Sequence, residues 1–151
     1  MQIISKNLAN TENLAISIAE KIKKEASANK KSATILALFG DLGTGKTTFT
    51  QSFAKSWGIT ETLNSPTFVI QRIYTLTDTV FQHLIHIDAY RLESGSELVH
   101  LGWKEIIEDT KNLIVIEWPE KVADILPDDM IKMHFTFIDE NTREIKIEEK
   151  R

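Results

Sequence analysis

One stretch of this sequence combines glycines, a lysine and three threonines in a spacing that suits phosphate binding. Residues 40–48 read Gly-Asp-Leu-Gly-Thr-Gly-Lys-Thr-Thr and contain the pattern G-x-x-x-x-G-K-[ST]. Glycines allow backbone N–H groups to turn toward an anion. The side chain of Lys46 is expected to reach the β- and γ-phosphates of a nucleotide, and the Thr47 hydroxyl to ligate Mg²⁺. The stretch therefore predicts a nucleotide-phosphate loop rather than a plain glycine turn with a surface lysine.

Two carboxylates follow apolar stretches and are candidates for the second protein ligand that a bound Mg²⁺ needs. Glu117 follows the run 113–116, and Asp88 follows the stretch 83–87. Open α/β sheets bind their ligands at the carboxyl ends of the strands, so both side chains are expected at that edge. Without the phosphate loop, each carboxylate would fit a helix cap or a salt bridge equally well. With the loop present, a functional role is the better interpretation for both.

Other kinds of site have little support. The chain has no cysteine, which excludes disulfides, thiolate zinc sites and thiol nucleophiles. Its histidines show no H-E-x-x-H spacing and no G-x-S-x-G partner, so zinc hydrolysis and Ser-His chemistry are not indicated. We expect all four to be packing residues; they are His83, His86, His100 and His134. Trp57 is expected in the core, and Trp118 fits either the core or a contact near the nucleotide.

The elements that must position the loop can be predicted on both sides of it. Residues 33–39 are nearly all apolar, as in a strand buried on both faces of a parallel sheet. From Lys46 onward the spacing becomes helical, with aromatic residues four apart, and Gly58 is well placed to stop that helix. The order strand, glycine loop, helix is the one that the phosphate-binding mechanism requires.

The rest of the chain predicts a sheet of mixed direction flanked by helices. Apolar residues recur every four positions over a helix of about 11 to 28, with Thr11 as its N-cap. Ser94 and Glu97 have capping-box spacing before a helical segment that Gly102 interrupts. The remaining predicted strands are a hairpin of 67–76 and 79–87 turning at 77–78, a strand at 113–116, and a hairpin of 131–138 and 143–148 around residues 139–142. We therefore predict one α/β P-loop NTPase domain over residues 1–151.

Composition limits the partners and the compartment. The 151 residues carry a net charge of −4 with a pI of about 5.6, which makes a broad nucleic-acid-binding face improbable. The apolar runs are far too short to span a membrane, and the first residues have no signal-peptide core. We expect a cytoplasmic protein with no membrane contact.

Four strings, taken together and in order, resemble the TsaE family of bacterial P-loop ATPases, also called YjeE. They are residues 40–48, Ser-Pro-Thr-Phe at 65–68, His-Ile-Asp-Ala-Tyr-Arg at 86–91 and Ile-Glu-Trp-Pro-Glu at 116–120. The resemblance covers nearly the whole chain. It implies the ATPase of the machinery that forms threonylcarbamoyladenosine beside the tRNA anticodon, with ATP and Mg²⁺ as cofactors. It also implies TsaB and TsaD as partners, with tRNA reached only through that complex.

The resemblance further implies a role for each matching residue. Thr47 and Glu117 would be the Mg²⁺ ligands, and Asp88 would position water or act as a switch beside the γ-phosphate, so that Lys46, Asp88 and Glu117 form the catalytic set. Ser65 and Thr67 would belong to a switch loop restricted by Pro66. The ATP-binding residues would be Thr11, Leu42, Gly43, Thr44, Gly45, Lys46, Thr47, Thr48 and Arg143, with Thr11 and Arg143 near the adenosine.

Two rival functions share the same loop. A small-molecule kinase would pass the phosphate to an acceptor, but the chain is short and its few arginines form no evident lid; they are Arg72, Arg91, Arg143 and Arg151. A nucleotide-sensing regulatory module would not need the set Thr47, Asp88 and Glu117, although switch proteins often keep one. A GTPase is less favoured because no N-K-x-D string occurs.

Overall fold

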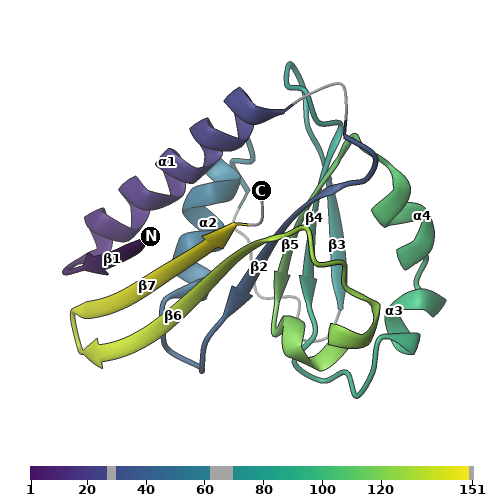
Figure 1. Ribbon diagram of the computed structural model, residues 1–151. Helices are drawn as coiled ribbons and strands as arrows, with labels where there is room; N and C mark the ends of the chain where they lie inside the picture. The colour runs from purple at the N-terminus through teal and green to yellow at the C-terminus, as the bar shows by residue number, and fades with distance from the viewer. Residues whose placement is uncertain (27–29, 62–69, 150–151) are drawn as a thin grey trace.

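Seven strands form one mixed sheet with helices on both of its faces (Figure 1). The computed structural model describes residues 1–26, 30–61 and 70–149. The strand order is β1-β7-β6-β2-β5-β4-β3. The strands are β1 (Gln2–Ser5), β2 (Thr34–Phe39), β3 (Gln71–Thr75), β4 (His83–Asp88), β5 (Asn112–Glu117), β6 (Ile131–Asp139) and β7 (Thr142–Glu149). The helices are α1 (Leu8–Glu25), α2 (Lys46–Lys55), α3 (Ser96–His100), α4 (Trp103–Glu108) and the 3₁₀ segment η1 (Pro119–Ile125).

The centre of the sheet is parallel and its two sides are antiparallel. β2 pairs in parallel with β5 and β6, and β5 pairs in parallel with β4. β3 closes one side antiparallel to β4, while β7 and β1 extend the other side beyond β6. The predicted α/β architecture with a mixed sheet is therefore confirmed.

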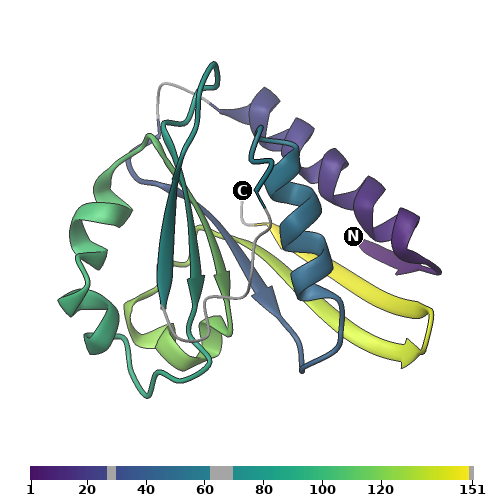
Figure 2. The same cartoon turned by 180° about the vertical axis from the view of Figure 1, so that it is seen from behind.

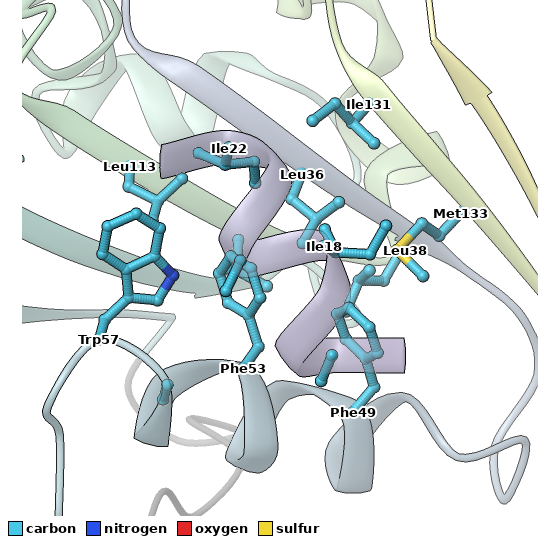
Figure 3. Packing of buried hydrophobic residues seen from close by; sticks show 14 of the residues in the cluster. Ile18, Ile22, Leu36, Leu38, Phe49, Phe53, Trp57, Leu113, Ile131 and Met133 are labelled. Atoms are coloured by element: carbon cyan, nitrogen blue, oxygen red, sulfur yellow. The ribbon is translucent and has the colours of Figure 1, made fainter. Parts of the chain in front are cut away.

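The helices divide into two groups that cover different faces. α1 and α2 lie side by side on one face, and α3, α4 and η1 lie on the other, as the two opposite views show (Figures 1 and 2). The first face holds the larger cluster, in which Ile18 and Ile22 of α1 and Phe49 and Phe53 of α2 pack on Leu36 and its strand neighbours (Figure 3). The second cluster joins Leu98, Trp103 and Val122 to the other side of β2, β5 and β4.

Most predicted elements lie where the apolar pattern places them. β2, the helix that begins at Lys46, β5 and the hairpin of β6 and β7 all form. Gly58 follows the α2 helix with φ +88° and donates its N–H to the Lys55 carbonyl (3.0 Å), and Gly102 at φ +90° separates α3 from α4. Trp57 is buried, as expected. β3 and β4 form the predicted antiparallel pair.

The cap assigned to Thr11 is wrong. α1 begins one turn earlier, at Leu8, because the side chain of Asn7 accepts the N–H of Asn10 (2.8 Å) and serves as the N-cap. Its last residue is Glu25, and the predicted extension to 28 includes residues outside the described chain.

Two local turns also differ from expectation. The connection between β3 and β4 covers residues 76–82 and is longer than the predicted turn at 77–78. Within it, the Thr79 hydroxyl donates to the Phe81 carbonyl and accepts the Phe81 N–H, so these two residues bond each other instead of a neighbouring strand. The part of the predicted strand at 67–69 lies outside the described residues. Ser94 does not cap α3, whose N-cap is Gly95. The Gly95 N–H instead donates to Asp124 of η1 (2.9 Å).

Two elements had no prediction: the edge strand β1 and the 3₁₀ segment η1. Within the described part of the chain, no helix is both long enough and apolar enough to cross a membrane.

Candidate nucleotide-phosphate site

The loop between β2 and α2 has the backbone shape of an anion-binding turn. Gly40, Gly43 and Gly45 all have positive φ, at +145°, +78° and +99°. Gly40 cannot be replaced without a clash, since a Cβ there would lie 2.7 Å from the Phe135 carbonyl oxygen. The Thr44 hydroxyl donates to the Asp41 carbonyl (2.7 Å) and closes the turn. The loop then runs into the N-terminus of α2, where free backbone N–H groups favour negative charge.

Lys46 and Thr47, the first two residues of α2, are placed differently. The Thr47 side chain is exposed and open to a ligand from solvent, whereas Lys46 is buried at 5% exposure. The Lys46 ammonium donates to the Gly40 carbonyl and lies 3.9 Å from the centroid of the Trp118 ring. In this structure the lysine therefore folds back across its own loop and onto an aromatic face.

Burial lowers the pKa of the Lys46 ammonium. The carboxylates of Glu117, Glu120, Asp88 and Asp41 oppose that shift. The lysine thus lies among negative charges that favour its protonated form. At this end of the sheet, a phosphate group would meet the positive charge of Lys46, and a cation would meet the negative charges of these carboxylates.

Glu117 and Asp88 meet at the carboxyl ends of parallel strands, as the sequence predicts. Glu117 ends β5 and is paired with Leu38 of β2 on one side and with Asp88 of β4 on the other. Both side chains are buried, with residue exposures of 4% and 8%. One oxygen of Asp88 accepts the N–H of Tyr90 (3.0 Å).

The donor chemistry at this edge fits Mg²⁺, which prefers hard oxygen ligands. A hydroxyl from Thr47 and a carboxylate from Glu117 are of the right kind; Thr47 lies in α2, which begins at the loop, and Glu117 ends β5 beside the last residues of β2. Among residues 1–26, 30–61 and 70–149, no group of three or more histidine or acidic side chains is arranged to hold a metal by itself. A magnesium ion bound here would take other ligands, such as phosphate oxygens and water, beside these two residues.

Arg143 borders the loop, and Thr11 is connected to Arg143 through β1. The Thr11 hydroxyl bonds the Ser5 hydroxyl (2.7 Å), and Ser5 pairs with Arg143 in the sheet. Arg143 Cγ lies 3.9 Å from the place that a Cβ on Gly45 would take, so this side chain borders the loop. Its guanidinium donates to the carbonyls of Asp139 and Thr142 and lies over the Phe137 ring. The structure therefore brings together two residues that are 132 positions apart in the sequence.

Of the remaining predicted site residues, some are described by the structure and the others lie outside the described residues. Leu42 is exposed at the tip of the loop and Thr48 is half-buried in α2. Ser65 and Thr67, the predicted switch residues, lie outside the described residues, as does Pro66.

His86 is a site residue that the sequence analysis missed. It was expected to be a packing residue, yet its Nε2 lies 2.7 Å from Glu117 Oε2, with both side chains buried. Its place two residues before Asp88, on the same face of β4, was the available signal. His100 also differs from expectation, since it is exposed at the end of α3, whereas His134 stacks on Phe39 with ring centroids 4.5 Å apart.

Trp118 packs against the second apolar cluster and also contacts Lys46 of the phosphate-loop sequence. It is half-buried, has a left-handed backbone (φ 57°, ψ 48°), and its ring packs against Lys46 and Tyr90. Pro119 follows it at the start of η1, and the Glu117 carbonyl accepts the N–H of Ala89 (3.0 Å). These contacts hold the residue after Glu117 in a conformation that non-glycine residues seldom adopt.

A cavity of about 420 Å³ lies at the opposite end of β2, beside Thr34 and Met130. It is remote from the loop and takes no part in the site described above.

Comparison with known proteins points to one family. The family model described as "Threonylcarbamoyl adenosine biosynthesis protein TsaE" matches residues 5–145. A Bacillus subtilis protein named tRNA threonylcarbamoyladenosine biosynthesis protein TsaE is 39% identical over 124 residues, which cover 82% of this chain and 75% of that protein. A Rickettsia felis protein of the same name is 34% identical over 125 residues, covering 82% and 70%.

A solved structure agrees with these sequence matches. The crystal structure of Bacillus subtilis YdiB superposes with a TM-score of 0.72 at 28% identity. The superposition covers 97% of this chain and 83% of that one, so the likeness includes both the parallel centre and the antiparallel sides of the sheet.

Proposed function

This chain belongs to the TsaE family, and we propose that it is a Mg²⁺-dependent ATPase acting in the formation of threonylcarbamoyladenosine on tRNA. The role in that tRNA modification follows from the family. The ATPase activity is supported by one observation above all. A phosphate loop of the right backbone shape stands between β2 and α2, and two buried carboxylates end the neighbouring strands at the same edge.

Each residue then has a chemical task. Lys46 would leave the Gly40 carbonyl and the Trp118 ring to bind the β- and γ-phosphates, a change that exchanges a neutral acceptor for an anionic one. Thr47 and Glu117 would hold Mg²⁺, which neutralises charge that develops on the phosphates during transfer. Asp88 would orient the attacking water, and Thr11 and Arg143 would lie near the adenosine.

The two carboxylates should differ in the step that they affect. Glu117→Ala is expected to weaken Mg²⁺-dependent nucleotide binding. Asp88→Ala is expected to keep nucleotide and lose turnover, because a positioned water matters mainly in the transition state. Binding of a fluorescent ATP analogue and steady-state phosphate release, measured on both variants, separate these outcomes. Full hydrolysis by Asp88→Ala would remove it from the catalytic set.

We further propose that TsaB and TsaD complete the site. Fast phosphoryl transfer needs a cation that neutralises the developing charge, and one supplied by a partner is worth about 10³ to 10⁵ in rate. In the sequence, Arg91 is the only arginine near a predicted catalytic residue, and it has interactions of its own. We therefore expect slow hydrolysis by the protein alone and faster hydrolysis with the partner proteins. Free tRNA is a poor activator for a chain of net charge −4.

Steady-state ATPase assays test this proposal. The protein is measured alone, with tRNA, and with TsaB and TsaD from the same source, and the Lys46→Ala variant is carried through every condition as the blank. Strong stimulation by tRNA alone, or none by the partner proteins, would contradict the mechanism and favour a small-molecule kinase. Transfer of labelled phosphate to an acceptor other than water would establish that alternative directly.

A further inference from the structure

His86 and Glu117 form a buried hydrogen-bonded pair that the mechanism above does not use. The His86 Nε2 and Glu117 Oε2 atoms are 2.7 Å apart, and the two side chains are 2% and 5% exposed. In the ladder of β4 and β5, His86 is opposite Val115 and Asp88 is opposite Glu117. His86 and Glu117 are therefore diagonal neighbours on one face of adjacent strands, a spacing that long side chains can bridge.

The direction of this hydrogen bond follows from the chemistry of the two groups. An ionised carboxylate only accepts hydrogen bonds, so Nε2 of His86 carries the hydrogen and donates it. The bond uses Oε2 of Glu117 and leaves Oε1 outside this contact. Both side chains are buried, but the Glu117 side chain has three rotatable bonds and the His86 side chain has two, so we take the imidazole to fix the carboxylate rather than the reverse.

We propose that His86 is a positioning residue that orients the Glu117 carboxylate, occupying one oxygen so that the other is presented to the metal ion. This inference rests on the proposed role of Glu117 as a Mg²⁺ ligand. Hydrogen-bonded partners of metal ligands fix ligand orientation, and their loss costs about 10- to 100-fold in metal affinity. A role in stability alone would leave metal affinity unchanged in a variant that still folds.

The experiment measures metal binding apart from turnover. Mn²⁺ replaces Mg²⁺, and its binding to the full chain with saturating ADP is followed by the electron paramagnetic resonance signal of free Mn²⁺. Affinity for a fluorescent ADP analogue in EDTA is measured in parallel. We expect His86→Leu to raise the Mn²⁺ Kd about 10- to 100-fold and to leave the affinity in EDTA nearly unchanged.

Two amide variants guard against failure of His86→Leu to fold. Glutamine places its N–H near the position of Nε2, so His86→Gln should bind Mn²⁺ within a few-fold of the parent. Asparagine is too short to reach Glu117, so His86→Asn should weaken Mn²⁺ binding as leucine does. His83→Gln is the matched control, since His83 begins the same strand at the end remote from Glu117.

The outcomes separate this inference from the proposal beneath it. Unchanged Mn²⁺ affinity in both His86→Leu and His86→Asn, beside weakened affinity in Glu117→Gln, would overturn the positioning role alone. Unchanged Mn²⁺ affinity in Glu117→Gln would overturn the assignment of Glu117 as a ligand, and the positioning role with it. Weakened affinity in His86→Asn with recovery in His86→Gln would support both.

Discussion

The two halves of the sheet differ in how much of each strand is enclosed. β4 and β5 are buried along nearly their whole length, because α1 and α2 cover one face while α3, α4 and η1 cover the other. β6 alternates between buried and half-buried residues and then becomes exposed toward Asp139. Among the described residues, neither β6 nor β7 contributes to the second apolar cluster.

This difference explains where the polar chemistry lies. A carboxylate at the end of a fully enclosed strand has lost most of its water, so it needs a partner such as His86 or a bound cation. On the half-covered side, Arg143 keeps its charge near solvent and satisfies its donors with backbone carbonyls. The enclosed half is therefore suited to hold a metal, and the open half to border the ligand.

The largest contrast should be in stability. Ile114 of β5 is completely buried, whereas Ile138 of β6 is 48% exposed. Ile114→Ala should lower the free energy of unfolding by about 2–5 kcal/mol through lost burial and a residual cavity. Ile138→Ala should change it by no more than about 0.5 kcal/mol. Urea denaturation of both variants measures the difference. Equal losses would contradict the view that only one half of the sheet is covered by helices on both faces.

Nucleotide affinity should respond next most strongly. Lys46→Ala removes the one cation of the loop and should weaken ATP binding by about 1.5–3 kcal/mol, because it loses a charge-assisted contact to phosphate. Lys146→Ala is the control from the half-covered side, where the side chain is exposed on β7. Titration with a fluorescent ATP analogue compares them. Parental affinity in Lys46→Ala would reject the phosphate site.

A smaller effect should appear where α1 meets β1. Thr11→Val keeps the shape of the side chain but removes the hydroxyl that bonds Ser5 inside the protein. We expect the free energy of unfolding to fall by about 1 kcal/mol. Thr136→Val, at an exposed position of β6, is the control and should be nearly neutral. A loss in Thr136→Val as large as that in Thr11→Val would show that the hydroxyl contact with Ser5 is not its cause.

The smallest effect concerns pH. Burial lowers the pKa of Lys46 below its ordinary value of 10.5, so the unfolded chain holds that proton more tightly than the folded one. The stability contributed by this residue should therefore rise as the pH increases through the lowered pKa and level off above 10.5. We expect the stability of the parent relative to Lys46→Met to be greater at pH 10 than at pH 8. Thermal unfolding at the two values checks the sign, and the opposite trend would contradict it.

Sequence reasoning succeeded where the signal is local and repeated. The apolar runs of β2 and β5 are as continuous as burial on both faces requires, and the phosphate-loop pattern lies within eight residues. It failed where a partner is distant. β1 has only four residues with no clear period, and its partner β7 lies about 140 positions later. Asn7 and Thr11 are both suitable cap types, but the Asn7 side chain accepts the Asn10 N–H while the Thr11 hydroxyl bonds Ser5 of β1, a partner that no local pattern specifies.

The site was predictable in composition but not in conformation. The pattern identifies Lys46 and Thr47, and strand ends identify Asp88 and Glu117. No local pattern specifies that Lys46 folds back onto Trp118, since that contact joins α2 to the residue after β5. The pair of His86 and Glu117 is of the same kind, because it depends on which strands are neighbours and in which register.

The place of β2 in the sheet also sets a limit on when the phosphate loop can form as the chain is synthesised. Both neighbours of β2 come from the later part of the sequence, β5 at Asn112–Glu117 and β6 at Ile131–Asp139. Gly40 lies against the carbonyl of Phe135, which is made almost a hundred residues after the loop itself. A ribosome-bound chain that stops before Ile131 therefore carries the complete phosphate-loop sequence without the strand that supports its first glycine, so we expect the proposed nucleotide binding to arise only after β6 has been synthesised.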